Sequence, residues 1–141
     1  MNTKSLEVLN QVFVAEMSGV VRYLHYSFMV MGYNRIPIQK WLRDQAMESM
    51  NHAIQVGEKI TSLGGHPPAM AGKIEETNLH SITQLLTESL KFEVEGLALY
   101  KKLAEIASAE GDIALEEMAR TLVREETDHI DEVQKMLRSP G

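Results

Sequence analysis

The sequence contains no cysteine. This absence excludes disulfide bonds, thiolate zinc sites and iron centres held by cysteine. No stretch approaches 18 consecutive apolar residues, so the sequence predicts no transmembrane helix and no membrane partner. Basic residues are scattered and few, with 14 lysines and arginines against 20 acidic residues and a net charge of −6. This balance argues against nucleic acid as a partner, because phosphate binding needs a clustered basic surface.

The rest of the composition is that of an ordinary globular protein. Hydrophobic residues make up 44% and charged residues 24% of the 141 residues, a length that suits one domain spanning residues 1–141. The first residues, Met1 to Ser5, show no apolar core of a signal peptide, so a cytoplasmic location is expected.

Four long segments carry apolar residues at helical spacing, and none alternates as a strand does. The first predicted helix runs from about Ser5 to Met31 and stops at Gly32. Pro37 suits the first turn of the second helix, which Gly64-Gly65 ends. A connection of about 15 residues, 66–80, separates this helix from the third.

Turn and cap residues define the second half of the chain. Ser81 and Gln84 form a capping-box pattern that opens the third helix, Gly111 closes it, Asp112 caps the fourth, and Pro140 ends the chain. Short turns within each helix pair and one long connection between the pairs predict an all-α four-helix bundle. A single long crossover between helices two and three is the ferritin-like topology.

A set of acidic, aromatic and imidazole residues occurs twice, 77 residues apart. Its members Glu16, Tyr23, Glu48 and His52 recur as Glu93, Tyr100, Glu125 and His129. One neighbouring residue breaks the rule, because the counterpart of Glu126 is Ser49. A duplicated set of carboxylates and imidazoles is typical of a site for two metal ions.

Three of these glutamates, Glu16, Glu93 and Glu126, lie within the apolar stripes of their helices. A buried carboxylate costs several kcal/mol unless it is paired, neutralised or bound to a cation. The alternative is that they pair with arginines, for which Arg22, Arg43, Arg120 and Arg124 are the candidates. Glu126 and His129 share one helix face and can hold one ion, and mixed carboxylate and imidazole ligands suit iron or manganese.

This pattern resembles the bacterioferritin family over almost the whole chain. The matching residues are Glu16, Tyr23, His52, Glu93, Glu126 and His129. The resemblance implies that Glu16 and His52 hold one iron, that Glu93 and His129 hold the other, and that Glu126 bridges them. It also implies Fe(II) oxidation by O₂ or peroxide, and iron storage or detoxification. The family's second bridging glutamate falls at Ser49.

Three outcomes of this departure stay open. In one, Glu48 replaces the missing bridge through a π-type turn before His52; the alternative is that Glu48 is a surface carboxylate. In another, one ion is held firmly by Glu93, Glu126 and His129 and the other weakly. In the third, ferroxidase chemistry is lost, and the chain is a haem-binding or electron-transfer dimer that does not store iron.

Met50 stands where the family has a methionine that ligates a b-type haem between two subunits. A second apolar stripe on each of the first two helices also predicts a subunit interface. These stripes comprise Met17, Leu24, Phe28 and Met31 on the first helix and Met47, Met50 and Ile54 on the second. The chain stops 12 residues after His129, without the fifth helix of the family's 24-subunit shells. A homodimer is therefore expected, with a larger assembly as the alternative.

Two further features concern the centre. Tyr23 and Tyr100 are predicted to hydrogen-bond the facing glutamates, and Tyr23 is the candidate catalytic residue. Gly19, in the middle of a helix, indicates the close approach of a partner or cofactor, or a helix packing contact.

Overall fold

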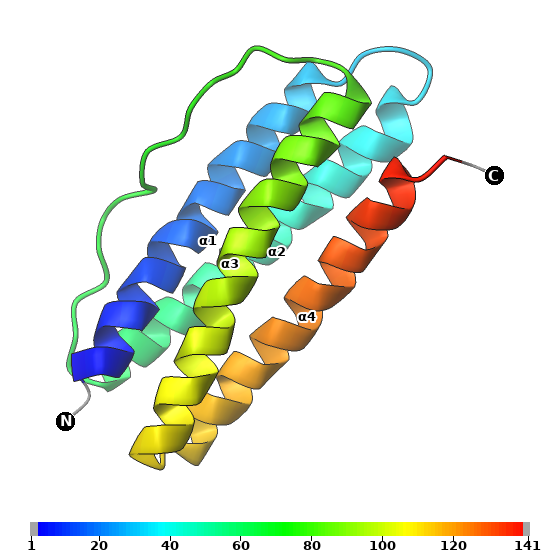
Figure 1. Cartoon of the computed structure of the whole chain (residues 1–141). Helices are drawn as coiled ribbons and strands as arrows, with labels where there is room; N and C mark the ends of the chain where they lie inside the picture. Colours follow the sequence, from blue (N-terminus) through cyan, green and yellow to red (C-terminus); the bar gives the residue numbers. More distant parts are fainter. Residues whose placement is uncertain (1–2, 140–141) are drawn as a thin grey trace.

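The computed structural model describes residues 3–139, which form four α-helices and no strand. The helices are α1 (Thr3–Met29), α2 (Arg35–Ser62), α3 (Ile82–Glu110) and α4 (Ile113–Leu137), arranged as a bundle (Figure 1). The predicted all-α four-helix bundle is therefore confirmed. Within residues 3–139, no helix combines the length and apolar character needed to cross a membrane. Pro140 lies outside the described residues.

The end of α1 differs from the sequence-based prediction. The helix ends at Met29 rather than at Met31. Two local features explain the early end: Gly32 has a φ of +97°, which favours glycine, and the Arg35 guanidinium donates a hydrogen bond to the Val30 carbonyl oxygen at 2.5 Å. The Arg35 side chain thus satisfies a carbonyl group that a further helical turn would otherwise use.

The predicted caps of α3 and α4 are confirmed. Ser81 accepts a hydrogen bond from the backbone N–H of Gln84, whose side chain accepts one from the backbone N–H of Ser81, so both halves of the capping box are formed. Gly111 ends α3 in the left-handed region, with a φ of +74°. The Asp112 carboxylate accepts from the backbone N–H of Leu115 at 3.0 Å and begins α4. These local signals determine where the second helix pair begins and turns.

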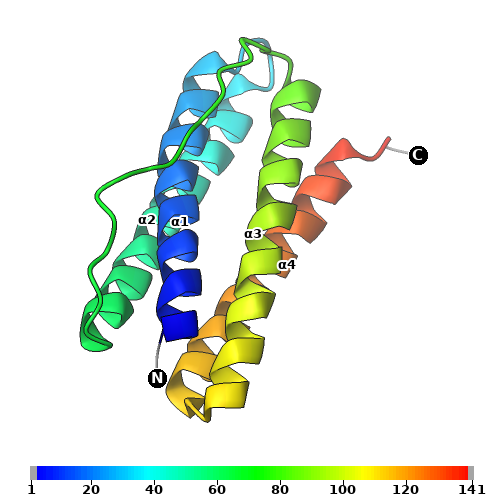
Figure 2. The same cartoon turned by 60° about the vertical axis from the view of Figure 1, so that its left-hand side comes forward.

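The long connection between α2 and α3 runs along the outside of the bundle beside α1 (Figures 1 and 2). It returns the chain to the end of the bundle where α1 finishes, so α3 runs antiparallel to α1. His25 on α1 contacts Glu76 of this segment, with Nε2 and Oε1 3.7 Å apart. The one long crossover predicted from the sequence is confirmed, and it brings the two halves of the repeat face to face.

The apolar core consists of two clusters. The larger contains Val8, Leu9, Val12, Val56, Ile60, Tyr100, Leu103, Ala107, Leu115, Ala119 and Leu122. The smaller contains Tyr23, Tyr26, Val30, Leu42, Ala46 and Leu85. A layer of buried polar residues lies between them along the helices, with Glu16 on α1, His52 on α2, Glu93 on α3 and Glu126 on α4. The core is therefore interrupted at the level of the repeated residues.

Candidate metal centre

Three glutamates from three helices are buried in this polar layer. Glu16 and Glu93 are 4% exposed and Glu126 is 8% exposed. One carboxylate oxygen of each has no hydrogen-bond partner, namely Glu16 Oε1, Glu93 Oε2 and Glu126 Oε1. Such groups are costly unless a cation compensates them. The unpartnered oxygens therefore fit a metal ion in the cavity that these side chains line.

The arginines that the sequence offered as alternative partners contact other residues. Arg120 pairs with Glu116 at 2.8 Å and Arg124 with Asp128 at 3.4 Å. Arg22 and Arg43 instead donate to the hydroxyl oxygens of Ser18 and Ser27, at 2.9 and 3.2 Å respectively. Among the residues that the structure describes, no salt bridge joins an arginine to Glu16, Glu93 or Glu126.

Glu93, Glu126 and His129 form one group of potential metal ligands. One oxygen or nitrogen atom from each lies within 4.8 Å of the others. Burial, followed by the charges of Glu93, Glu16 and Glu48, raises the pKa of Glu126 to about 9. A divalent cation would favour the ionised carboxylate and release its proton.

His52 faces two carboxylates at once. Its Nδ1 lies 3.4 Å from Glu16 Oε1, and its Nε2 lies 2.6 Å from Glu125 Oε2. The contact between His52 Nδ1 and Glu16 Oε1 is not a hydrogen bond, since this oxygen has no hydrogen-bond partner. The contact between His52 Nε2 and Glu125 Oε2 is a hydrogen bond. Burial alone would lower the pKa of His52, but Glu16 and Glu125 outweigh it and raise the pKa to about 9.

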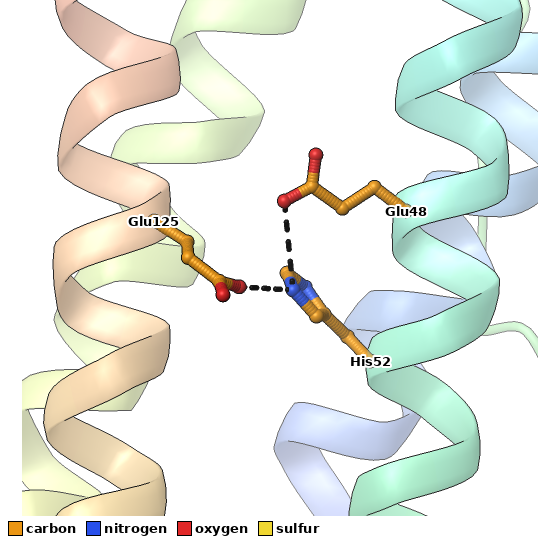
Figure 3. Close-up of side chains that lie close together, drawn as sticks. All are labelled: Glu48, His52 and Glu125. Atoms are coloured by element: carbon orange, nitrogen blue, oxygen red, sulfur yellow. Dashed lines mark hydrogen bonds and ion pairs between the residues drawn. The ribbon is translucent and has the colours of Figure 1, made fainter.

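A second potential ligand group consists of Glu48, His52 and Glu125. Figure 3 shows Glu48 and His52 extending from α2 toward Glu125 on α4, and one ligand atom from each lies within 4.8 Å of the others. Glu125 was not among the ligands predicted from the sequence. Its signal is its place in the repeat, 77 residues after Glu48.

Glu48 faces the histidines rather than only solvent. Its Oε2 lies 2.8 Å from His129 Nε2 and its Oε1 lies 3.7 Å from His52 Nε2. The hydrogen bond from His129 lowers the pKa of Glu48. The π-type turn predicted before His52 is absent, since α2 is α-helical throughout; a spacing of four residues already places Glu48 beside His52. A bridging role for Glu48 stays a prediction.

Ser49 lies in the buried polar layer, at the position where the first half of the repeat lacks the carboxylate that Glu126 supplies in the second. It is 9% exposed and lines the same cavity as the three glutamates. A Cβ atom added to Gly19 would come within 2.6 Å of the Ser49 hydroxyl oxygen. The close approach indicated by Gly19 is therefore a packing contact between α1 and α2.

Tyr23 belongs to the same layer. Its hydroxyl donates a hydrogen bond to Glu93 and lies 3.0 Å from the hydroxyl oxygen of Ser89, which confirms its predicted contact with a glutamate. Burial and the nearby charge of Glu93 raise the pKa of Tyr23 well above its ordinary value. Tyr100 also lines the cavity. Its hydroxyl group makes no hydrogen bond to a side chain among the described residues, so the predicted contact of Tyr100 with a glutamate is wrong.

Met50 lies outside the centre, on an exposed face of the bundle. It is 42% exposed and has Met47 and Ile54 as exposed apolar neighbours along α2. Leu24, Phe28 and Met31 are likewise exposed on or just after α1. An apolar group of this extent at the surface is typical of an interaction site.

Comparisons with known proteins agree with this architecture. Residues 6–139 match the family model Ferritin, described as a ferritin-like domain. The bacterioferritin of Brucella melitensis is 28% identical over 142 residues, covering 95% of this chain and 83% of that protein.

Two solved structures share the fold. A ferritin-like, di-iron carboxylate protein from Bacillus anthracis superposes with a TM-score of 0.91 at 24% identity, covering 96% of each chain. The bacterioferritin of Rhodobacter capsulatus, solved with a metal-free dinuclear site and a haem iron in a crystallographic special position, superposes with a TM-score of 0.84. It is 22% identical and covers 97% of this chain and 85% of that one.

Proposed function

Because the chain belongs to the ferritin-like family, we propose that it binds Fe(II) at the buried centre, oxidises it and contributes to iron storage or detoxification. The observation that carries this proposal is the set of three buried carboxylates, each with one unpartnered oxygen, beside two histidines. Iron is the substrate of this ferroxidase-type reaction, with O₂ or peroxide as the oxidant. The proposed location is the cytoplasm.

The ligands divide into a stronger and a weaker set. Glu93, Glu126 and His129 hold one ion, while Glu16 and His52 hold the other, with Glu126 between them. Two Fe(II) ions carry four positive charges, and the three buried carboxylates neutralise three of them. Ser49 leaves the second ion short of a ligand, with the predicted substitute Glu48 nearby at the histidines. We therefore propose that one ion binds firmly and the second weakly.

The proposed reaction transfers two electrons and takes up two protons for each pair of Fe(II) ions. Two Fe(II) ions give up one electron each. These two electrons, with two protons, convert one hydrogen peroxide into two water molecules, or one O₂ into one hydrogen peroxide. Glu126 and His52 both have pKa values of about 9 before iron binds, so both release a proton when an ion binds. Tyr23 is the proposed catalytic residue, because its hydroxyl contacts the ligand Glu93 directly.

An anaerobic Fe(II) titration tests this proposal. The wild-type protein should saturate near one firmly held ion per chain, and Glu126→Gln should lose that ion, because it removes the charge at constant size. Glu117→Gln, on the exposed side of the same helix, is the matched control and should titrate as the wild type does. Equal binding by both variants would contradict the metal centre, and a sharp break at two ions would contradict the unequal sites.

A second candidate function rests on Met50 and its surroundings. Met50 is exposed among apolar side chains, and the related protein of Rhodobacter capsulatus carries a haem iron in a crystallographic special position. We propose a homodimer that buries these stripes and holds a b-type haem between two Met50 side chains. In the ferroxidase-impaired alternative, this dimer transfers electrons and does not store iron.

The visible spectrum of the purified protein tests the haem proposal. A Soret band that Met50→Leu abolishes is the expected result, with Met47→Leu as a control on the same apolar stripe. Colourless protein that does not bind added haem would refute it. Sedimentation velocity of both variants measures the oligomeric state separately and distinguishes a dimer from a larger assembly.

A further inference from the structure

Two carboxylates of the repeat, Glu48 and Glu125, are not explained by the buried ligand set. They occupy equivalent positions in the two halves, on α2 and α4 respectively. Their side chains are 33% and 41% exposed, whereas the three ligand glutamates are almost fully buried. Both line the groove between α2 and α4, as does His52.

The contacts of these two glutamates are crossed between the halves. Glu125 Oε2 on α4 lies 2.6 Å from His52 Nε2 on α2. In return, Glu48 Oε2 on α2 lies 2.8 Å from His129 Nε2 on α4. Each half of the repeat therefore supplies the carboxylate that contacts the imidazole of the other half.

The atoms involved decide which imidazole nitrogen is available to a metal. A neutral imidazole has one N–H donor and one nitrogen lone pair. If Nε2 carries the proton and donates to a carboxylate, Nδ1 presents its lone pair. In His52, Nδ1 is the nitrogen on the side of the buried Glu16, 3.4 Å from its unpartnered oxygen. In His129, Nε2 is the nitrogen that contacts Glu48, so by the same rule Nδ1 would present the lone pair.

We infer that Glu125 and Glu48 are positioning residues, which fix the tautomer and orientation of His52 and His129, respectively, from the opposite helix. This inference rests on the proposed function, because it assigns how the iron ligands are held. The two imidazole–carboxylate contacts also tie α2 to α4, a pair that packs less closely than α1 with α2 or α3 with α4. Glu48 then acts through His129, and the bridge missing at Ser49 stays missing.

Zn(II), which is diamagnetic and redox-inert, is a suitable probe for this inference. Long-range ¹H–¹⁵N spectra of the Zn(II)-loaded protein, labelled at histidine, show which nitrogen carries the proton and which binds metal. We expect Nδ1 bound to Zn(II) and Nε2 protonated in His52 and His129. Binding of Zn(II) through Nε2 in either histidine would overturn the inference without any variant.

Alanine variants test the crossed pairing. Glu125→Ala should leave the His129 signals unchanged, disturb those of His52, and weaken the ion beside Glu16. Glu48→Ala should do the reverse. The expected loss in Zn(II) affinity is about 10- to 100-fold, the usual effect of removing a hydrogen-bond partner of a metal-bound histidine. An effect of Glu48→Ala on the His52 ion alone would instead identify Glu48 as the substitute ligand.

Glutamine variants separate positioning from direct ligation. The amide oxygen of Glu125→Gln or Glu48→Gln still accepts a hydrogen bond from Nε2–H, so most of the affinity should return. A glutamine variant as weak as its alanine counterpart would show that the carboxylate itself binds metal, and would overturn the inference. A wild-type protein that binds neither Zn(II) nor Fe(II) would overturn the proposed function together with this inference. Binding of metal without the expected effects of the variants would overturn this inference alone.

Discussion

Replacing Ser49 by glutamate should restore the carboxylate that the first half of the repeat lacks. Ser49 is buried, lines the cavity with Glu16 and Glu126, and packs against Gly19, whose lack of a Cβ atom accommodates the side chain of residue 49. A fourth carboxylate would neutralise the charge of two Fe(II) ions. The second, weaker ion should therefore bind more tightly in Ser49→Glu than in the wild-type protein.

The size of this effect follows from charge and entropy. Two unit charges about 4 Å apart attract each other by about 4 kcal/mol at an effective dielectric constant of about 20. Ordering a glutamate side chain costs up to about 2 kcal/mol. The remaining gain of about 2 kcal/mol corresponds to a roughly 30-fold increase in affinity for the second ion.

Anaerobic Fe(II) titration of Ser49→Glu should move the saturation point from near one ion per chain to near two. The metal-free variant should also melt at a lower temperature than the wild type, because a fourth buried carboxylate adds repulsion and desolvation cost. Ser49→Gln is the matched control, with the same size and no charge. Identical Fe(II) titrations for the glutamate and glutamine variants would refute the reasoning.

Three further predictions concern pH, packing and capping. The free energy of unfolding of the metal-free protein, measured in urea, should fall as pH rises from about 4.5 to 9. Over this range the folded protein keeps protons that the unfolded chain releases, on Glu126 (pKa about 9 against an ordinary 4.5) and on His52 (pKa about 9 against 6.5). A stability that does not change with pH would contradict this. Gly19→Ala places a Cβ 2.6 Å from the Ser49 hydroxyl oxygen and should cost about 1–3 kcal/mol in chemical denaturation, whereas an unchanged midpoint would show that the Ser49 side chain moves aside without cost. Asp112→Ala removes the cap of α4 and should cost about 1 kcal/mol while the Fe(II) titration stays the same.

The fold was predictable because its signals are local. Apolar spacing marks each helix, and residues such as Ser81 and Asp112 make their capping contacts within three residues along the chain. The end of α1 was misplaced because it depends on the side chain of Arg35, which contacts the Val30 carbonyl from the next helix. A contact of that kind has no periodic pattern in the sequence.

The buried layer was also predictable in outline. Glu16, Glu93 and Glu126 interrupt apolar stripes, and the structure places all three in one layer with His52. The partners of the two histidines were not predictable, because a surface glutamate looks the same in sequence whether it faces solvent or another helix. Glu125 gave only the signal of its repeated position.

The amino-acid sequence specifies where the four helices lie, which of their faces are apolar and which glutamates interrupt those faces, because these properties follow from spacing along one helix. The contacts of Glu125 with His52, of Glu48 with His129 and of Gly19 with Ser49 are set by how the helices dock on one another. Each of these contacts joins two helices. It depends on their rotation and offset to within a few ångströms, which the docking of all four helices sets and the pattern of one helix does not.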